Sequence, residues 1–131
     1  MSASGCAATG DSARPVARLE WRWCRGGCPY SVDLSTADLL LQSLGSLLNA
    51  NVRGEDVACR YGGEEFALLL PGADLKQTAT RAEQIRQAVG DLKISSQGHP
   101  IGMITVSMGV AASPLHGTHL TQLMRSADFA L

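Results

Sequence analysis

The sequence predicts one α/β domain of the α+β type, in which helices cover a largely antiparallel sheet. Stretches of helical and of strand periodicity alternate from residue 35 onward, in the order helix, strand, hairpin, strand, helix, strand, helix. Two of the strands are separated by the short segment Gly62-Gly63, which is typical of an antiparallel hairpin. With 131 residues, of which 45% are hydrophobic, the chain is long enough to bury one core without disulfide or metal support.

The first predicted helix starts at Ser35, which together with Asp38 resembles an N-cap arrangement. Its apolar positions recur at helical spacing and comprise Leu40, Leu41, Leu44, Leu47 and Leu48. Residues 57–61 are predicted to form a strand before the glycine turn. The apolar run 66–70 after the turn is typical of a central strand that is covered on both faces.

A second helix is predicted to begin after Asp74, with Gln77 at the capping-box position, and to end at Gly90. Its expected inner face comprises Leu75, Ala79, Ala82, Ile85, Arg86 and Val89. Residues 103–110 have a period of two, with Ile104, Val106, Met108 and Val110 on one face, and form the clearest predicted strand. A third helix is expected from about Thr118.

Residues 1–34 differ in composition from residues 35–131, which contain the patterned elements. The first segment is rich in Gly, Ser, Ala, Arg and Cys, and its alternation near Glu20 allows one short strand. Arginines beside Trp21 and Trp23 are compatible with base stacking or a membrane-surface contact, but they are few. We therefore expect residues 1–34 to form a divergent, partly ordered arm.

Net charge, hydropathy and cysteine spacing argue against several classes of protein, namely nucleic-acid-binding, membrane-spanning, secreted and zinc-binding proteins. A net charge of −1 gives no basic surface for general nucleic-acid binding, so no nucleic acid is expected as a partner. The sequence contains no apolar run of membrane-spanning length and no secretory signal, which favours a cytoplasmic location. The four cysteines and three histidines lack the spacing of a zinc site, so reduced thiols and surface histidines are expected.

The turn between the two central strands, Arg60-Tyr-Gly-Gly-Glu-Glu-Phe66, is the main candidate for a site. Glycines allow the backbone to approach a ligand, and their N–H groups can bind phosphates. The carboxylates of Glu64 and Glu65 are hard oxygen ligands, which suit Mg²⁺. A Gly-Gly hairpin turn is expected to use positive φ, which glycine adopts at little cost. The alternative to a binding site is an exposed Gly-Gly turn with solvated acids.

This segment and its apolar flanks closely resemble the GGEEF form of the signature of the GGDEF family, the diguanylate cyclases. The resemblance extends from about Asp38 to Leu131 and includes ITVSMGVA and the final SADFAL. It implies a cyclase/polymerase-palm-like fold. It also implies Mg²⁺-dependent condensation of two GTP molecules into cyclic di-GMP, with release of two pyrophosphates, between two domains of a homodimer.

The resemblance also implies roles for individual residues. Gly62 and Gly63 would lie against the nucleotide, and Asp38 would accept hydrogen bonds from the guanine N1–H and amino group. Glu64 would bind Mg²⁺ and help to deprotonate the attacking 3′-hydroxyl, and Glu65 would be a second essential acid. For Asp38, the alternative is a charge that merely complements the start of its helix.

Arg53-Gly-Glu-Asp56 matches the RxxD pattern of the family's inhibitory product-binding site. Arg53 can bind a phosphate or the guanine edge with two hydrogen bonds, and Asp56 can accept from guanine. The family's supporting arginine on the following helix corresponds to Gln84, with Arg81 and Arg86 nearby as substitutes.

The chain departs from the family pattern before Asp38. An ungapped count places Trp21 at the metal-binding aspartate, Gly26 at a lysine and Pro29 at a guanine-binding asparagine. The sequence also stops at Leu131, ahead of a Tyr and a phosphate-binding Lys. We therefore expect an incomplete domain that lacks the family's N-terminal strand and C-terminal end, with a sheet edge left unpaired.

Three functions remain open at this point. The chain is a diguanylate cyclase with impaired or no activity, a non-catalytic module that binds cyclic di-GMP through Arg53 and Asp56, or an inert fragment. The departures from the family pattern favour low activity, because the loss of one preorganised charge contact typically lowers a rate about 10²- to 10³-fold.

Overall fold

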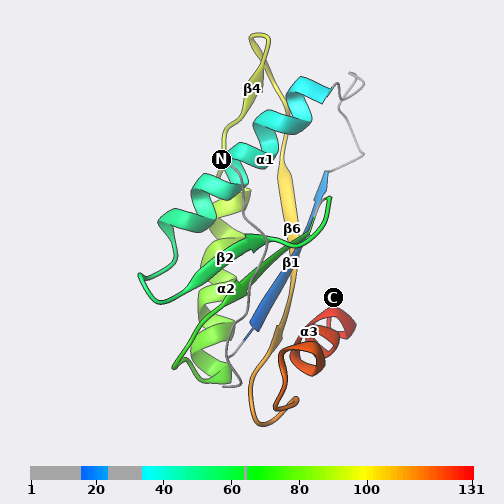
Figure 1. Cartoon of the computed structure of the whole chain (residues 1–131). Coiled ribbons are helices and arrows are strands. Elements are labelled where there is room, and N and C mark those ends of the chain that lie inside the picture. The colour runs from blue at the N-terminus through cyan, green and yellow to red at the C-terminus, as the bar shows by residue number, and fades with distance from the viewer. Residues whose placement is uncertain (1–15, 24–33, 64) are drawn as a thin grey trace.

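The computed structural model of the chain describes residues 16–23, 34–63 and 65–131 (Figure 1). The described elements follow one another in this order: β1 (Val16–Trp23), α1 (Leu34–Ala50), β2 (Val57–Arg60), β3 (Glu65–Leu69), α2 (Leu75–Gly90), β4 (Ser95–Ser96), β5 (His99–Pro100), β6 (Ile104–Ala111) and α3 (Leu120–Phe129).

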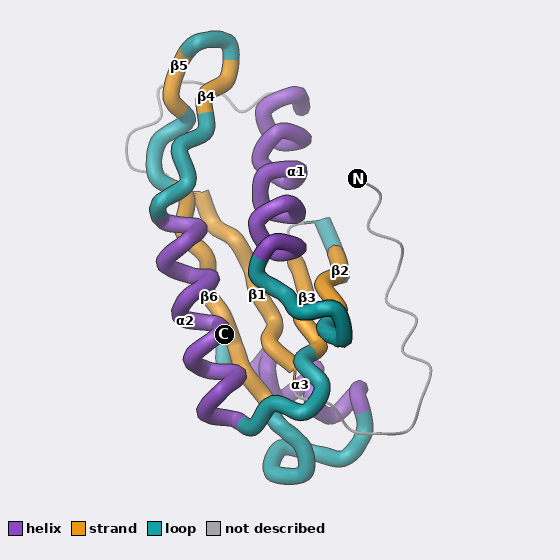
Figure 2. The backbone as a smooth tube through the Cα atoms, turned by 90° about the vertical axis from the view of Figure 1, so that its left-hand side faces the viewer, coloured by secondary structure: helices purple, strands orange, loops and turns teal. Residues whose placement is uncertain are grey.

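A four-stranded sheet in the order β2-β3-β1-β6 is the centre of the fold, and all three of its strand pairs are antiparallel. Helices α1 and α2 lie on one face of this sheet and α3 lies on the other (Figures 1 and 2). The predicted α+β class with a mostly antiparallel sheet flanked by helices is confirmed. No helix in the described ranges has the length and apolar character needed to cross a membrane.

Strand β1 corrects the expectation that the first strand is missing. Its backbone pairs with β6 along all eight residues and with β3 from Val16 to Glu20, so the sheet has no unpaired central edge. The short alternation in the sequence near Glu20 therefore does indicate a strand, and that strand is longer than the alternation suggests. Strand pairing is made by backbone groups, so a strand can occupy this place without the family's characteristic side chains. The rest of the expected arm, residues 1–15 and 24–33, lies outside the described residues.

The two long helices begin in different ways. Helix α1 already includes Leu34, so Ser35 lies in its first turn and the prediction that Ser35 is the N-cap is wrong. Helix α2 has the predicted capping box: the Gln77 N–H donates to the Asp74 carboxylate at 2.7 Å, and the Asp74 N–H donates to the Gln77 side chain at 2.9 Å. Two otherwise unsatisfied N–H groups at the start of α2 are thereby bonded.

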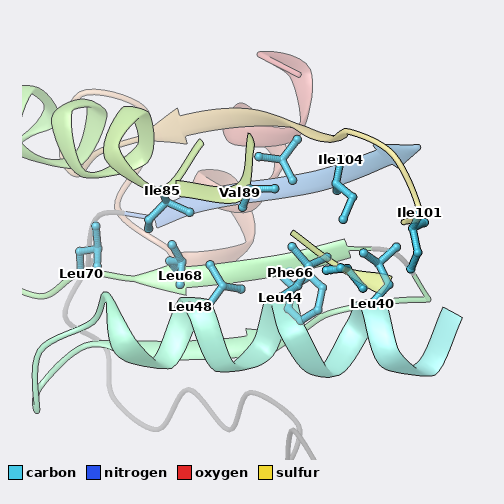
Figure 3. Close-up of a cluster of buried hydrophobic side chains, with 12 residues drawn as sticks. Leu40, Leu44, Leu48, Phe66, Leu68, Leu70, Ile85, Val89, Ile101 and Ile104 are labelled. Atoms are coloured by element: carbon cyan, nitrogen blue, oxygen red, sulfur yellow. The ribbon is translucent and has the colours of Figure 1, made fainter. Parts of the chain in front are cut away.

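The core lies mainly between the sheet and the α1–α2 layer (Figure 3). Its fully buried members are the predicted α1 leucines Leu40, Leu44 and Leu48, with Leu68, Ile85, Val89 and Ile104. On α2 the prediction is partly wrong, because Thr78 is buried whereas Ala79 is exposed. The Thr78 hydroxyl donates to the Asp74 carbonyl oxygen at 2.7 Å, which satisfies the buried polar group.

A smaller core lies on the opposite face, where α3 packs on the sheet. It contains Leu69, Ala111, Leu123 and Ala127. The alternation of β6 explains both cores, because Ile104 and Val106 face α1 and α2 whereas Ala111 faces α3. Gly109 lies on the α3 side, directly under the backbone of Ala127.

A small hairpin, β4–β5, was not predicted from the sequence. Its turn uses positive φ at Gln97 (52°) and Gly98 (80°), the geometry of tight two-residue hairpin turns. The hydroxyl groups of Thr36 and Ser96 are hydrogen-bonded at 2.8 Å, which ties this hairpin to the start of α1.

Candidate nucleotide-binding site

A pocket of about 330 Å³ lies between α1 and the β2–β3 hairpin. Its polar lining residues are Asp38, Gln42 and Asn49 of α1 and Arg60 of β2. Its other lining residues are Leu41, Gly45, Leu48, Ala58, Cys59 and Phe66. A pocket that combines apolar side chains with a few polar groups is the usual form of a small-molecule site.

Helical periodicity brings the polar groups of α1 to one side. Gln42 lies one turn after Asp38, and Asn49 lies two further turns along the same face. The structure thus places the predicted Asp38 in the pocket and adds two amide side chains that the sequence analysis missed. Helical spacing from Asp38 places them on its face of α1, but this spacing indicates a site only once the pocket is known. A carboxylate and two amides in a pocket that also has apolar walls can bind the hydrogen-bonding edge of a planar ring.

The Gly62-Gly63 turn adjoins this pocket through Arg60. The backbone N–H groups of Tyr61 and Gly62 donate to the Glu65 carbonyl oxygen at 2.8 and 3.2 Å, which closes the turn. The Arg60 side chain donates from Nε to the Gly62 carbonyl oxygen at 3.1 Å and from Nη2 to the Gly63 carbonyl oxygen at 2.8 Å. The predicted hairpin is confirmed.

The backbone conformation of the two turn glycines differs from the predicted one. Neither Gly62 nor Gly63 has positive φ, so the expectation of a left-handed turn is wrong. A Cβ on Gly62 would lie 3.1 Å from Oε2 of Glu65. A Cβ on Gly63 would meet no described atom within 4 Å apart from its chain neighbours. Gly63 therefore faces open space, where a ligand can approach the backbone.

The acidic residues of the signature are only partly described. Glu65 begins β3 and is half-buried, and the strand register places Glu20 of β1 opposite it. Glu64 lies outside the described residues. No group of three or more His, Cys, Asp or Glu in the described part of the chain is arranged to hold a metal ion. The donor chemistry of two consecutive glutamates nevertheless fits Mg²⁺, which needs only one or two protein carboxylates beside substrate phosphates.

Cys59 lies in the wall of the pocket, is almost fully buried and takes part in a disulfide bond. The expectation of reduced thiols is therefore wrong for this residue. It was based on the usual redox state of cytoplasmic proteins, which says nothing about whether two thiols lie close together in a fold. Cys6, Cys24 and Cys28 lie outside the described residues.

A second pocket, of about 620 Å³, contains the RxxD residues. Arg53 and Asp56 lie in the loop after α1, where the Arg53 N–H donates to the Asp56 carboxylate at 2.8 Å. Glu55 of the same loop also lines this pocket. The segment after β3 and helix α2 complete the lining with Leu70, Pro71, Gly72, Ala73, Asp74, Lys76, Gln77, Thr80, Arg81 and Gln84. The two pockets have no lining residue in common.

The structure distinguishes the two arginines that were candidates to replace the one expected at Gln84. Arg81 lines the second pocket, where its guanidinium donates to the Asn51 carbonyl oxygen. Arg86 is instead bonded to the carboxylate of Glu83 at 2.7 and 2.8 Å. This hydrogen bond lowers the pKa of Glu83 below its ordinary value. Arg81 and Lys76 are thus the basic residues of α2 that line the same pocket as Arg53.

Comparisons with known proteins agree with this arrangement. Residues 34–131 match the family model described as "Diguanylate cyclase, GGDEF domain". The response regulator PleD of Caulobacter vibrioides is 35% identical over 92 residues, which cover 70% of this chain and 20% of PleD. Diguanylate cyclase A of Treponema denticola is 30% identical over 97 residues, covering 74% of this chain and 26% of that protein. The chain therefore spans a fifth to a quarter of the length of these curated relatives.

A solved structure shows the same fold. The GGDEF domain of DgcB from Caulobacter crescentus, in complex with c-di-GMP, superposes with a TM-score of 0.77 and 28% identity, covering 91% of this chain and 70% of that one. The sequence match and the fold agree, and the chain belongs to the GGDEF family of diguanylate cyclase domains.

Proposed function

We propose that the chain is a guanine-nucleotide-binding domain of the diguanylate cyclase type, which condenses GTP into cyclic di-GMP with impaired turnover. The observation that carries the proposal is the pocket in which Asp38 of α1 and Arg60 of the hairpin line one cavity beside Gly63. Such a pocket provides an anionic acceptor for a base and, next to it, a cationic and glycine-rich segment for phosphates.

Asp38 is the residue that selects the base. Guanine presents two neighbouring donors, N1–H and the 2-amino group, and a carboxylate can accept from both. Adenine presents an acceptor at N1 and no 2-amino donor, so the same carboxylate disfavours it. The apolar lining residues Leu41, Leu48 and Phe66 supply the surfaces against which a purine ring can pack.

The turn would bind the phosphates and the metal. Gly63 faces open space, which allows phosphate oxygens to approach the backbone. Glu64 would hold Mg²⁺, which neutralises phosphate charge when bound, and Glu65 would be the second essential acid. Glu64 would also accept the proton of the attacking 3′-hydroxyl. Since two GTP molecules react, two copies of the domain must meet, so we propose a homodimer as the active state, in the cytoplasm.

Impaired turnover follows from the residues before α1. By the ungapped count, Trp21, Gly26 and Pro29 stand where the family has an aspartate, a lysine and an asparagine. β1 supplies the strand but not the aspartate at Trp21. Each missing charge contact typically lowers the rate about 10²- to 10³-fold.

The test is chromatographic detection of cyclic di-GMP after incubation of the folded chain with GTP and Mg²⁺. We expect a rate at least about 10²-fold below that of a complete GGDEF domain, and no product from Glu64→Ala. Glu83→Ala, which alters an exposed acid on α2, is the control and should leave the rate unchanged. A rate equal to that of a complete domain would contradict the impairment. Product formation that survives Glu64→Ala would contradict the assigned role.

A second function, cyclic di-GMP binding without turnover, is favoured by the separate second pocket. Arg53, Arg81 and Lys76 bring three positive charges to it, and Asp56 provides a carboxylate that can accept from guanine. Because this pocket shares no residue with the first, binding there does not require an intact catalytic turn.

Arg53→Ala is expected to weaken cyclic di-GMP binding by about tenfold to a hundredfold, because it removes a charge-assisted hydrogen-bond donor. Calorimetric titration of the wild type and the variant measures this. Glu64→Ala should bind cyclic di-GMP like the wild type. Equal loss of affinity in both variants would place the ligand at the turn rather than in the second pocket.

A further inference from the structure

We propose that Arg60 is a positioning residue that fixes the orientation of the Gly62 and Gly63 peptides for phosphate binding; this rests on the proposed function. Arg60 is the last residue of β2 and lines the first pocket. Its Nε and Nη2 atoms donate to the carbonyl oxygens of Gly62 and Gly63 at 3.1 and 2.8 Å. One guanidinium therefore holds two consecutive peptide groups.

Peptide geometry gives these two bonds a consequence for ligand binding. In a trans peptide the C=O and N–H groups point in opposite directions. The Gly62 carbonyl and the Gly63 N–H belong to one peptide, so fixing the carbonyl on Arg60 turns that N–H away from the guanidinium. An outward N–H attracts a phosphate, whereas an outward carbonyl repels it.

The turn needs such a restraint because glycine backbones are the least restricted. The bonds from the Tyr61 and Gly62 N–H groups to the Glu65 carbonyl oxygen fix the entry to the turn. They do not fix the Gly62 and Gly63 carbonyls, which Arg60 binds. A planar guanidinium can donate in parallel to two acceptors, but the ammonium of lysine acts as a point charge on a flexible stem.

The Arg60→Lys substitution separates this role from simple charge attraction. It keeps the positive charge but removes the pair of N–H donors that bind the two carbonyl oxygens. Titration calorimetry with Mg²⁺ measures the affinity for GTP and for guanosine, and hydrogen–deuterium exchange measures the mobility of residues 60–66. We expect the dissociation constant for GTP to rise about tenfold, the effect of one typical hydrogen bond. The affinity for guanosine should stay within about twofold, because the base contacts are unchanged. Deuterium uptake in residues 60–66 should increase.

Arg86→Lys is the matched control, because Arg86 also donates from Nε and Nη2, but to Glu83 on the exposed side of α2. It should change neither the affinity nor the uptake. Unchanged GTP affinity and uptake in Arg60→Lys would overturn the proposal. Equal loss of GTP and guanosine binding with a lower melting temperature would overturn it too, by showing a general folding role. A wild type that binds neither ligand would refute the proposed function, and the uptake comparison would still decide whether Arg60 restrains the turn.

Discussion

Replacing Gly109 with alanine is expected to destabilise the domain strongly, because a Cβ at this position would come closer to its neighbours than at any other glycine in the described residues. Gly109 is buried in β6, and a Cβ there would lie 1.8 Å from the carbonyl oxygen of Ala127 and 2.8 Å from its carbonyl carbon. These are backbone atoms of α3, so the clash cannot be relieved by a side-chain rotation. The helix must move away and open the core around Leu123.

We expect a loss of about 3 kcal/mol or more in the free energy of unfolding, the upper range for overpacking. In a domain of this size that lowers the melting temperature by roughly 10 °C or more. Thermal unfolding followed by circular dichroism measures it. Gly90→Ala is the control, since a Cβ there meets no atom within 4 Å, and should change stability little. Equal melting temperatures for the two variants would refute the close packing of α3 on β6.

Asp38→Asn is expected to abolish the preference for guanine. The substitution preserves shape but leaves one acceptor oxygen, and it turns an amide donor toward a guanine donor. We expect GTP affinity to fall by about tenfold to a hundredfold, the effect of a bidentate base contact, while ATP affinity stays weak. Competition between the two nucleotides for a fluorescent GTP analogue measures both values.

The control for this substitution is Asp91→Asn. Asp91 is exposed at the C-terminal end of α2 and does not line the pocket, so the control removes an equal charge elsewhere. It should leave GTP affinity unchanged. If Asp38→Asn also has no effect, Asp38 does not bind the guanine base. The alternative role at the helix start is not supported either, because Asp38 is the fifth residue of α1 and lies beyond its first turn.

Much of the fold follows from periodicity. The α1 leucines, the capping box at Asp74 and the alternation of β6 were all predictable, because each depends on spacing along one element. The β1 strand was underestimated because its pairing with β3 and β6 is made by backbone groups that the side-chain pattern does not reveal. The Thr78–Ala79 error has a similar origin, since a threonine can be buried once its hydroxyl is bonded to a backbone carbonyl.

The binding roles of the candidate site residues stay predictions, but the structure shows where these residues lie. Asp38 lines one pocket, whereas Arg53 and Asp56 line another. Gln42 and Asn49 were missed because exposed amides on a helix carry no motif until the pocket is known. The disulfide at Cys59 and the contacts of Arg60 with Gly62 and Gly63 depend on three-dimensional proximity, which residue types alone do not reveal.

The central claim is that a guanine nucleotide binds between α1 and the glycine turn. A titration of the ¹⁵N-labelled chain with GTP and Mg²⁺, followed by backbone amide chemical shifts, tests it most directly. We predict saturable shifts at Gly62, Gly63 and the α1 residues around Asp38, with little change at Arg53 and Asp56. The absence of shifts in a folded sample, or shifts confined to the Arg53–Asp56 loop, would contradict the claim.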